Sequence, residues 1–125
     1  MNVIISKSTP YTAVEIKSLS EQYEVFIKTV IDLTRRVCSA GSVMHYECEE
    51  VLLKDGSRQE DLWGGGIDLE TKMITYNSFI NIRPAMRNSS NEIQDEERRR
   101  KYEELTKYFF AEILDIKNGK KEDDK

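Results

Sequence analysis

The sequence has few of the residues that would point to a metal centre or a disulfide framework. Only two cysteines, Cys38 and Cys48, and one histidine, His45, occur among its 125 residues. A Cys/His zinc site therefore cannot be completed, and the spacing of the two cysteines matches no metal-binding motif. We expect both thiols to be free, as is usual in a reducing compartment.

Long apolar runs and an excess of basic charge are also missing. No stretch approaches the ~18 apolar residues of a membrane-spanning helix, and residues 1–6 lack the length and the basic flank of a signal peptide. We therefore expect a cytoplasmic protein without membrane association. The formal net charge of −4 argues against general nucleic-acid binding, which usually relies on a basic patch.

Helix and strand patterns intermix along the chain without strict alternation. Runs of β-branched and aromatic residues predict strands, and these lie at residues 3–5, 25–33, 37–39, 62–69 and 73–83. Helices are expected to begin near residues 12, 41 and 95. The mixture predicts a single α+β domain over residues 1–116, with a mixed or mainly antiparallel sheet of about four to five strands and three helices packed on it. Residues 117–125 carry no apolar side chain and are expected to form a disordered charged tail.

Local signals indicate where the helices begin and end. Thr12 and Glu15 have the spacing of a capping box, and Gly56 stands where a C-terminal cap belongs. The acids from Asp95 to Glu97 favour a helix N-terminus because they complement the helix dipole. The apolar stripe of this last helix consists of Tyr102, Leu105, Phe109, Ile113 and Ile116.

The segment from Asn77 to Pro84 is unusually polar for an expected strand. By the period of two, one face carries Asn77, Phe79, Asn81 and Arg83, and the other, expected to face the core, carries Tyr76, Ser78, Ile80 and Ile82. Arg83 offers a bidentate fork to a carboxylate or phosphate, and the amides of Asn81 and Asn88 would orient that ligand. The alternative is that Arg83 pairs with an acid such as Asp61 or Glu49 and pins the following loop.

His45 and Glu49 are four residues apart on the second expected helix and therefore face the same way. A carboxylate beside an imidazole raises the pKa of the histidine and fixes its tautomer, an arrangement suited to acid–base catalysis. These two residues are the candidate catalytic pair. The alternative is a pair on the helix surface, or a histidine tied to a neighbouring loop.

The segment from Asp55 to Gly66 combines polar loop residues with a tryptophan and three glycines. Ser57, Gln59 and Asp61 offer donors and acceptors for a ligand, and Trp63 offers a flat ring for stacking. The glycines after Trp63 indicate a bulge or a close approach by backbone or ligand. The alternative is a helix cap followed by a polar turn, with Trp63 in the core.

The basic run from Arg98 to Lys101 lies among glutamates. Glu96 and Arg100, like Glu97 and Lys101, have the spacing of favourable ion pairs on a helix. We therefore interpret this run as a charged helix face rather than as a nucleic-acid site.

Two motifs carry a resemblance to a known family. They are Asp55-Gly-Ser-x-Gln-Glu-Asp-Leu-Trp-Gly64 and Ile80-Asn-Ile-Arg-Pro84, with Gly41, the helix at 45–53 and Asn88 in support. The chain resembles, from residue 3 to 114, a family of small prokaryotic proteins described only as a domain of unknown function. It departs from the family at Glu47, where an aspartate is usual, and at Gly66, where an asparagine is usual. The resemblance implies one compact domain and supplies no chemistry.

Two hypotheses of function follow. The first is a protein that binds a small anionic ligand of nucleotide or phosphate type, with hydrolysis by His45 as an extension, so an enzymatic role stays open. We expect no cofactor; a divalent metal ion held by Asp61 and Glu49 is an alternative without a supporting motif. The second is a non-enzymatic interaction module or a homo-oligomer, in which the polar cluster is structural.

Overall fold

The structure, a computed structural model, describes residues 4–23 and 26–114. These residues form a five-stranded sheet from β1 (Ile5–Lys7), β2 (Phe26–Asp32), β3 (Val37–Ala40), β4 (Leu62–Asp68) and β5 (Ile74–Thr75). The helices are α1 (Ala13–Tyr23), α2 (His45–Lys54), α3 (Glu96–Phe109) and the short α4 (Ala111–Leu114). Single 3-10 turns form η1 (Gln59–Asp61), η2 (Phe79–Asn81) and η3 (Pro84–Met86). In the described ranges, no helix has the length and apolar character needed to cross a membrane.

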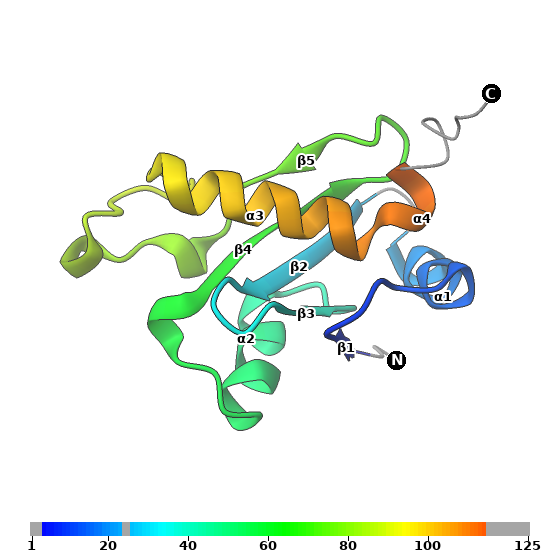
Figure 1. Ribbon diagram of the computed structural model, residues 1–125, viewed down its shortest axis with the longest axis horizontal. Coiled ribbons are helices and arrows are strands. Elements are labelled where there is room, and N and C mark those ends of the chain that lie inside the picture. The colour runs from blue at the N-terminus through cyan, green and yellow to red at the C-terminus, as the bar shows by residue number, and fades with distance from the viewer. Residues whose placement is uncertain (1–3, 24–25, 115–125) are drawn as a thin grey trace.

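The strands lie in the order β1-β3-β2-β4-β5, and every neighbouring pair is antiparallel. Helices cover both faces of this sheet (Figure 1), with α1 and α3 on one face and α2 on the other. The expected α+β fold with a mainly antiparallel sheet is confirmed.

The alternation of side chains along the central strands divides the core into two parts. Ile27 and Ile31 of β2 face α1 and α3 together with Trp63, whereas Val30 faces α2 together with Leu62. The larger part contains the buried stripe of α3, from Tyr102 to Phe109, and the smaller part contains Cys48 and Leu52. Both cysteines are free and buried.

The capping signals expected at Thr12, Gly56 and Asp95 are observed, whereas α2 begins at His45 rather than near residue 41. The Thr12 hydroxyl accepts the backbone N–H of Glu15, and the Glu15 carboxylate accepts that of Thr12. Asp95 caps α3 by accepting the Arg98 N–H, and Gly56 has a φ of +106° just after α2. However, α3 ends at Phe109, so Ile113 belongs to α4. Ile116 and the expected tail lie outside the described residues.

The expected strand over residues 73–83 is wrong after its first residues. β5 ends at Thr75, and the chain then turns through η2. The side chain of Asn81 takes the place of a paired strand next to β4, and it is buried, whereas Phe79 is 84% exposed and Ile82 is 43% exposed. The expected division into a polar face and a core face therefore does not apply to this segment, because the period of two holds only in extended backbone.

Candidate functional site

The loop that follows β5 is held against the sheet by the amide of Asn81. Its Oδ1 accepts the Gly64 N–H at 2.8 Å, and its Nδ2 donates to the Gly64 carbonyl at 3.0 Å. The same Nδ2 also donates to the carbonyls of Tyr76 and Asn91. No strand residue pairs with Gly64 on this side of β4. The Asn81 side chain therefore satisfies both the N–H and the carbonyl of Gly64.

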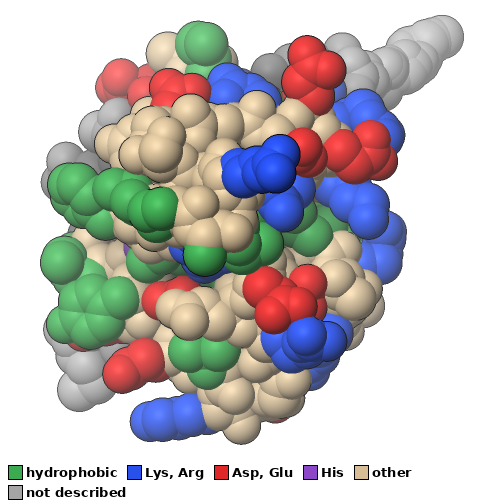
Figure 2. All heavy atoms as spheres, turned by 90° about the vertical axis from the view of Figure 1, so that its left-hand side faces the viewer, with side chains coloured by type: hydrophobic (Ala, Val, Ile, Leu, Met, Phe, Trp, Pro, Cys, Tyr) green, Lys and Arg blue, Asp and Glu red, His purple; other side chains and the backbone are tan. Residues whose placement is uncertain are grey.

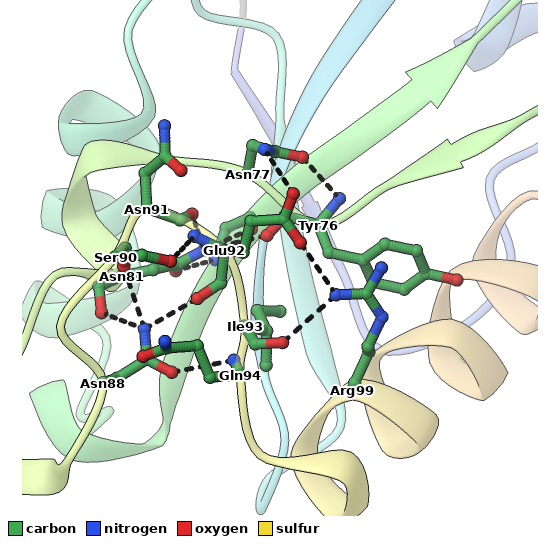
Figure 3. Close-up of polar contacts among 11 residues, drawn as sticks. Tyr76, Asn77, Asn81, Asn88, Ser90, Asn91, Glu92, Ile93, Gln94 and Arg99 are labelled. Atoms are coloured by element: carbon green, nitrogen blue, oxygen red, sulfur yellow. Dashed lines mark hydrogen bonds and ion pairs between the residues drawn. The ribbon is translucent and has the colours of Figure 1, made fainter.

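Asn88 closes the same loop from inside. Its Nδ2 donates to the carbonyls of Asn81, Ser90 and Glu92 at 2.8, 3.0 and 2.7 Å, and its Oδ1 accepts the Gln94 N–H. Figure 3 shows this amide pointing into a ring of backbone groups from both ends of the loop. The amides of Asn81 and Asn88 therefore hold a rigid frame, and their hydrogen-bonding capacity is used within the protein.

This frame positions Arg83 between the sheet and α2. The Arg83 Nη2 lies 3.5 Å from a Glu49 oxygen, and both side chains are about nine-tenths buried. The guanidinium also lies 4.5 Å from the centre of the Trp63 ring, and Gln59 donates to Glu49. The pairing with Glu49 that the sequence offered as an alternative is thus present, and Glu49, Gln59, Arg83 and Trp63 meet.

Arg83 nevertheless keeps unused hydrogen-bonding capacity. Both terminal nitrogens are buried and have no hydrogen-bond partner in the structure. Burial lowers the pKa of Arg83, the Glu49 carboxylate opposes that shift, and the neighbouring Arg98 adds to it. A buried guanidinium held by one long ion pair and one ring is costly, and such a group calls for an explanation.

His45 has a partner that the sequence did not indicate. Its Nε2 lies 2.7 Å from the Gly65 carbonyl oxygen, and because a carbonyl only accepts, Nε2 carries the proton and Nδ1 carries a lone pair. Burial lowers the pKa of His45, and Lys28 lowers it further. The expectation that Glu49 raises this pKa is therefore wrong, since Glu49 faces Arg83 and Gln59 instead.

His45 borders an open hollow between α2 and η2. Two adjoining cavities of about 250 and 190 Å³ share Lys28, His45, Ser78 and Phe79 in their walls. Only a glycine at position 64 lets Ser78 and His45 lie so close to β4, because a Cβ there would lie 2.8 Å from the Ser78 Cβ and 3.2 Å from the His45 ring. The close approach expected at the glycines is therefore made by η2 and α2.

The rim of this hollow is apolar. Three large hydrophobic side chains in its walls are exposed, namely Met44, Tyr46 and Phe79. Figure 2 shows hydrophobic side chains gathered on the α2 side of this face and charged side chains on the α3 side. The hollow thus combines a cation, a neutral imidazole and exposed rings, which is suited to a ligand with an anionic and a flat apolar part.

Sequence reasoning found His45 and did not find Lys28 or the role of Phe79. A signal for Lys28 was present, because a lysine interrupts the β-branched run that forms β2. In a strand buried on both faces, a lysine indicates a local opening to water through which its ammonium group is solvated.

The remaining candidates lie elsewhere. Ser57 donates to Asp32 at 2.6 Å and accepts from Arg35 at 2.8 Å, so it belongs to a cluster at the turn after β2. Asp61 and Trp63 border a second hollow on the α3 side of the sheet. Trp63 is 1% exposed and belongs to the core. The candidates thus divide among separate clusters rather than one cleft.

Within residues 4–23 and 26–114, no three His, Cys, Asp or Glu side chains are grouped so that they could hold a metal ion. Asp61 and Glu49 therefore do not have a third ligand of these types beside them in the described part of the chain.

Neither the curated proteins nor the solved structures yield a match to this chain. One family model matches residues 3–109, which include every element from β1 to α3 and all the candidate site residues. The chain belongs to the family described as protein of unknown function DUF5674.

Proposed function

We propose that the chain binds a small molecule with a phosphate-type anionic group and a flat apolar group, such as a nucleotide, in the hollow between α2 and η2. The observation that carries the proposal is Lys28. It is half-buried, it lines both cavities, and it has no ion pair within the described ranges. An ammonium group placed in this way attracts an anion more strongly than a fully solvated one.

His45 complements Lys28 because it is neutral near pH 7. Its lowered pKa keeps the imidazole uncharged, and the Nδ1 lone pair accepts a hydrogen bond from a hydroxyl or amino group of the ligand. Phe79, with most of its ring exposed, supplies a surface on which a nucleobase stacks. The rigid frame made by Asn81 and Asn88 holds Phe79 in place without the need for a ligand.

The first experiment measures binding by calorimetry with AMP, ADP, ATP, GMP and inorganic phosphate. We expect Lys28→Ala to weaken nucleotide binding about tenfold or more, because a hydrogen bond to a charged group contributes about 1.5–3 kcal/mol. Phe79→Ala should weaken the binding of nucleotides by a similar factor, since stacking of one base is worth about 1–3 kcal/mol. The binding of inorganic phosphate should be unchanged.

The matched control is Lys54→Ala, which removes the same charge from the exposed end of α2 and should leave binding unchanged. Equal binding by the parent and by Lys28→Ala would remove Lys28 from the role. The absence of saturable binding for the whole panel would refute the proposal for nucleotides.

The pH dependence of binding supplies a second test. The hydrogen bond that Nδ1 accepts from the ligand stabilises the neutral imidazole, so the pKa of His45 is lower in the complex than in the free protein, and affinity falls as the pH decreases below the ordinary 6.5 of histidine. The second proton of a phosphate monoester also titrates near pH ~6, and His45→Gln separates the two effects. We expect the variant to lose the part of the fall in affinity that His45 contributes.

Hydrolysis is a further step, for which His45 is the candidate base. An assay for released phosphate with the parent and His45→Gln tests it directly. Turnover that is equal in both proteins would exclude His45 as the base.

The same face favours a second candidate function, self-association with another copy of the chain. The supporting observation is the exposed apolar rim formed by Met44, Tyr46 and Phe79, since apolar patches of this kind mark interaction sites. Light scattering at several concentrations tests it. A mass that rises with concentration in the parent, and stays monomeric in Phe79→Ser, would favour self-association; a constant monomer would oppose it.

A further inference from the structure

A second hollow of about 300 Å³ opens on the charged side of the molecule, where η1, β4 and the first turns of α3 meet. Its walls include Asp61, Trp63, Arg98 and Lys101, with Leu33 and Met86 as apolar surface. A volume at the small end of the range for ligand pockets suits a small molecule. This hollow is separate from the one that Lys28 and His45 border.

The charges in this hollow do not balance one another. Two of its acids have partners elsewhere, because Glu60 pairs with Arg58 and Glu97 pairs with Arg100, each at 2.6 Å. Among the residues that the structure describes, Asp61, Arg98 and Lys101 form no ion pair. One carboxylate and two cations therefore line the same hollow with their charges uncompensated.

Asp61 is held apart from the cations by its backbone. Its N–H donates to the Arg58 carbonyl at 2.9 Å, and its carbonyl accepts the Leu33 N–H at 3.0 Å, which fixes it at the end of the β2–β4 ladder. Its carboxylate and the Arg98 guanidinium line one hollow but lie beyond ion-pair distance. A ligand with opposite charges a few bonds apart can bridge them.

Arg98 and Arg83 contact the same tryptophan ring. The guanidinium of Arg98 is 4.9 Å from the centre of the Trp63 ring, and that of Arg83 is 4.5 Å from the same centre. The positive charge of Arg98 lowers the pKa of Arg83, so the two cations repel each other. An anionic group bound at Arg98 would offset this repulsion, which favours the carboxylate end of a ligand there.

We infer that this hollow binds a free amino acid with an apolar side chain. The carboxylate meets Arg98 and Lys101, the ammonium group meets Asp61, and the side chain packs on Met86 and Leu33. Both charged ends are required, because each meets a group that otherwise stays uncompensated. The inference does not depend on nucleotide binding at Lys28.

Trp63 makes the experiment direct, because it is the only tryptophan of the chain. Its fluorescence is titrated with L-leucine, L-methionine and L-phenylalanine, and calorimetry confirms the affinities. Two analogues of leucine test the charges separately: N-acetyl-leucine lacks the ammonium group, and leucinamide lacks the carboxylate. We expect both analogues to bind about tenfold or more weakly than leucine, as the loss of one charge-assisted hydrogen bond implies.

Variants assign each charge to its residue. Arg98→Ala should weaken leucine binding about tenfold and reduce the preference for leucine over leucinamide, of which Lys101 keeps a part. Asp61→Asn should remove the preference for leucine over N-acetyl-leucine. Lys107→Ala, which removes a cation paired with Glu103 further along α3, is the matched control and should change neither preference.

These preferences are ratios, so partial unfolding of a variant does not mimic them. Lys101→Ala, at an exposed position, gives a further variant whose folding is not at risk, and it should weaken leucine more than leucinamide. The inference is overturned if none of the three amino acids gives saturable binding at millimolar concentration, if either analogue binds as well as leucine, or if Arg98→Ala leaves the affinity unchanged.

Discussion

Asn81→Ala tests how the loop that carries η2 and Arg83 is held to the sheet. The Asn81 side chain has no exposed surface and makes four hydrogen bonds to backbone groups. Two of its acceptors keep another donor, because Ile93 donates to the Tyr76 carbonyl and Ser78 donates to the Asn91 carbonyl. The substitution therefore leaves two buried groups without a partner, the N–H and the carbonyl of Gly64.

The magnitude follows from these two groups. A buried backbone group that loses its partner costs about 1–3 kcal/mol, so the free energy of unfolding should fall by about 3–4 kcal/mol once partial entry of water is allowed for. A domain of this size is stable by about 5–15 kcal/mol. The variant should therefore fold, but with a clearly lower midpoint of unfolding.

Urea unfolding at equilibrium, followed by circular dichroism and by Trp63 fluorescence, measures the loss. The control is Asn77→Ala, which removes an exposed amide with two hydrogen bonds of 3.3 Å, one donated to Glu92 and one accepted from the Tyr76 N–H. We expect the slope of the unfolding free energy against urea concentration to be unchanged in both variants. The midpoint should be lower for Asn81→Ala alone. A loss below about 1 kcal/mol, similar to that of the control, would refute the argument that Asn81 replaces a strand.

Three further predictions concern His45, Gly65 and the cysteines. Burial lowers the pKa of His45 below its ordinary 6.5 in the folded chain, so the unfolded chain binds more protons and the free energy of unfolding should fall as the pH decreases below 6.5. His45→Gln should reduce this fall, as measured by urea unfolding at a series of pH values. A Cβ at Gly65 would lie 2.2 Å from the Thr75 carbonyl oxygen and 2.6 Å from the Tyr102 hydroxyl, so Gly65→Ala should cost about 2 kcal/mol or more and speed amide exchange in α3. Burial raises the pKa of Cys48 to about 11 and also raises that of Cys38, so both thiols should react with a disulfide reagent only as fast as the chain opens.

The ends of the helices could be predicted from the sequence because their signals are local. Thr12 and Glu15 are three residues apart and satisfy each other's backbone groups, and Asp95 caps α3 through an N–H three residues away. Such signals act within one turn of helix, so the capping partners and their hydrogen-bond distances do not depend on the rest of the fold. Strand β2 was predicted for a similar reason, since Ile27, Thr29, Val30 and Ile31 make a β-branched run that is longer than any turn.

The segment after β5 could not be predicted because its decisive partner is distant in sequence. The Asn81 side chain pairs with the backbone of Gly64, where a neighbouring strand would otherwise pair. Nothing in the sequence next to Asn81 signals this contact. Alternation of polar and apolar residues then arises without a strand. The strand pattern places Phe79 and Asn81 together on the face away from the core, whereas in the 3-10 turn Phe79 is exposed and Asn81 is buried.

The partner of His45 was equally hidden, because a backbone carbonyl has no signature in the sequence. Lys28 was not hidden. The period of two places Lys28 on the same face of β2 as Val30, which packs against Cys48 and Leu52 of α2. Burying an ammonium group there without a partner would be prohibitive, so the cover formed by α2 must stop short of Lys28. The hollow lies there, at the first turn of α2, where His45 begins the helix. Lys28, the one cation of the central strand β2, therefore marks both the face and the end of the sheet at which the helical cover is open.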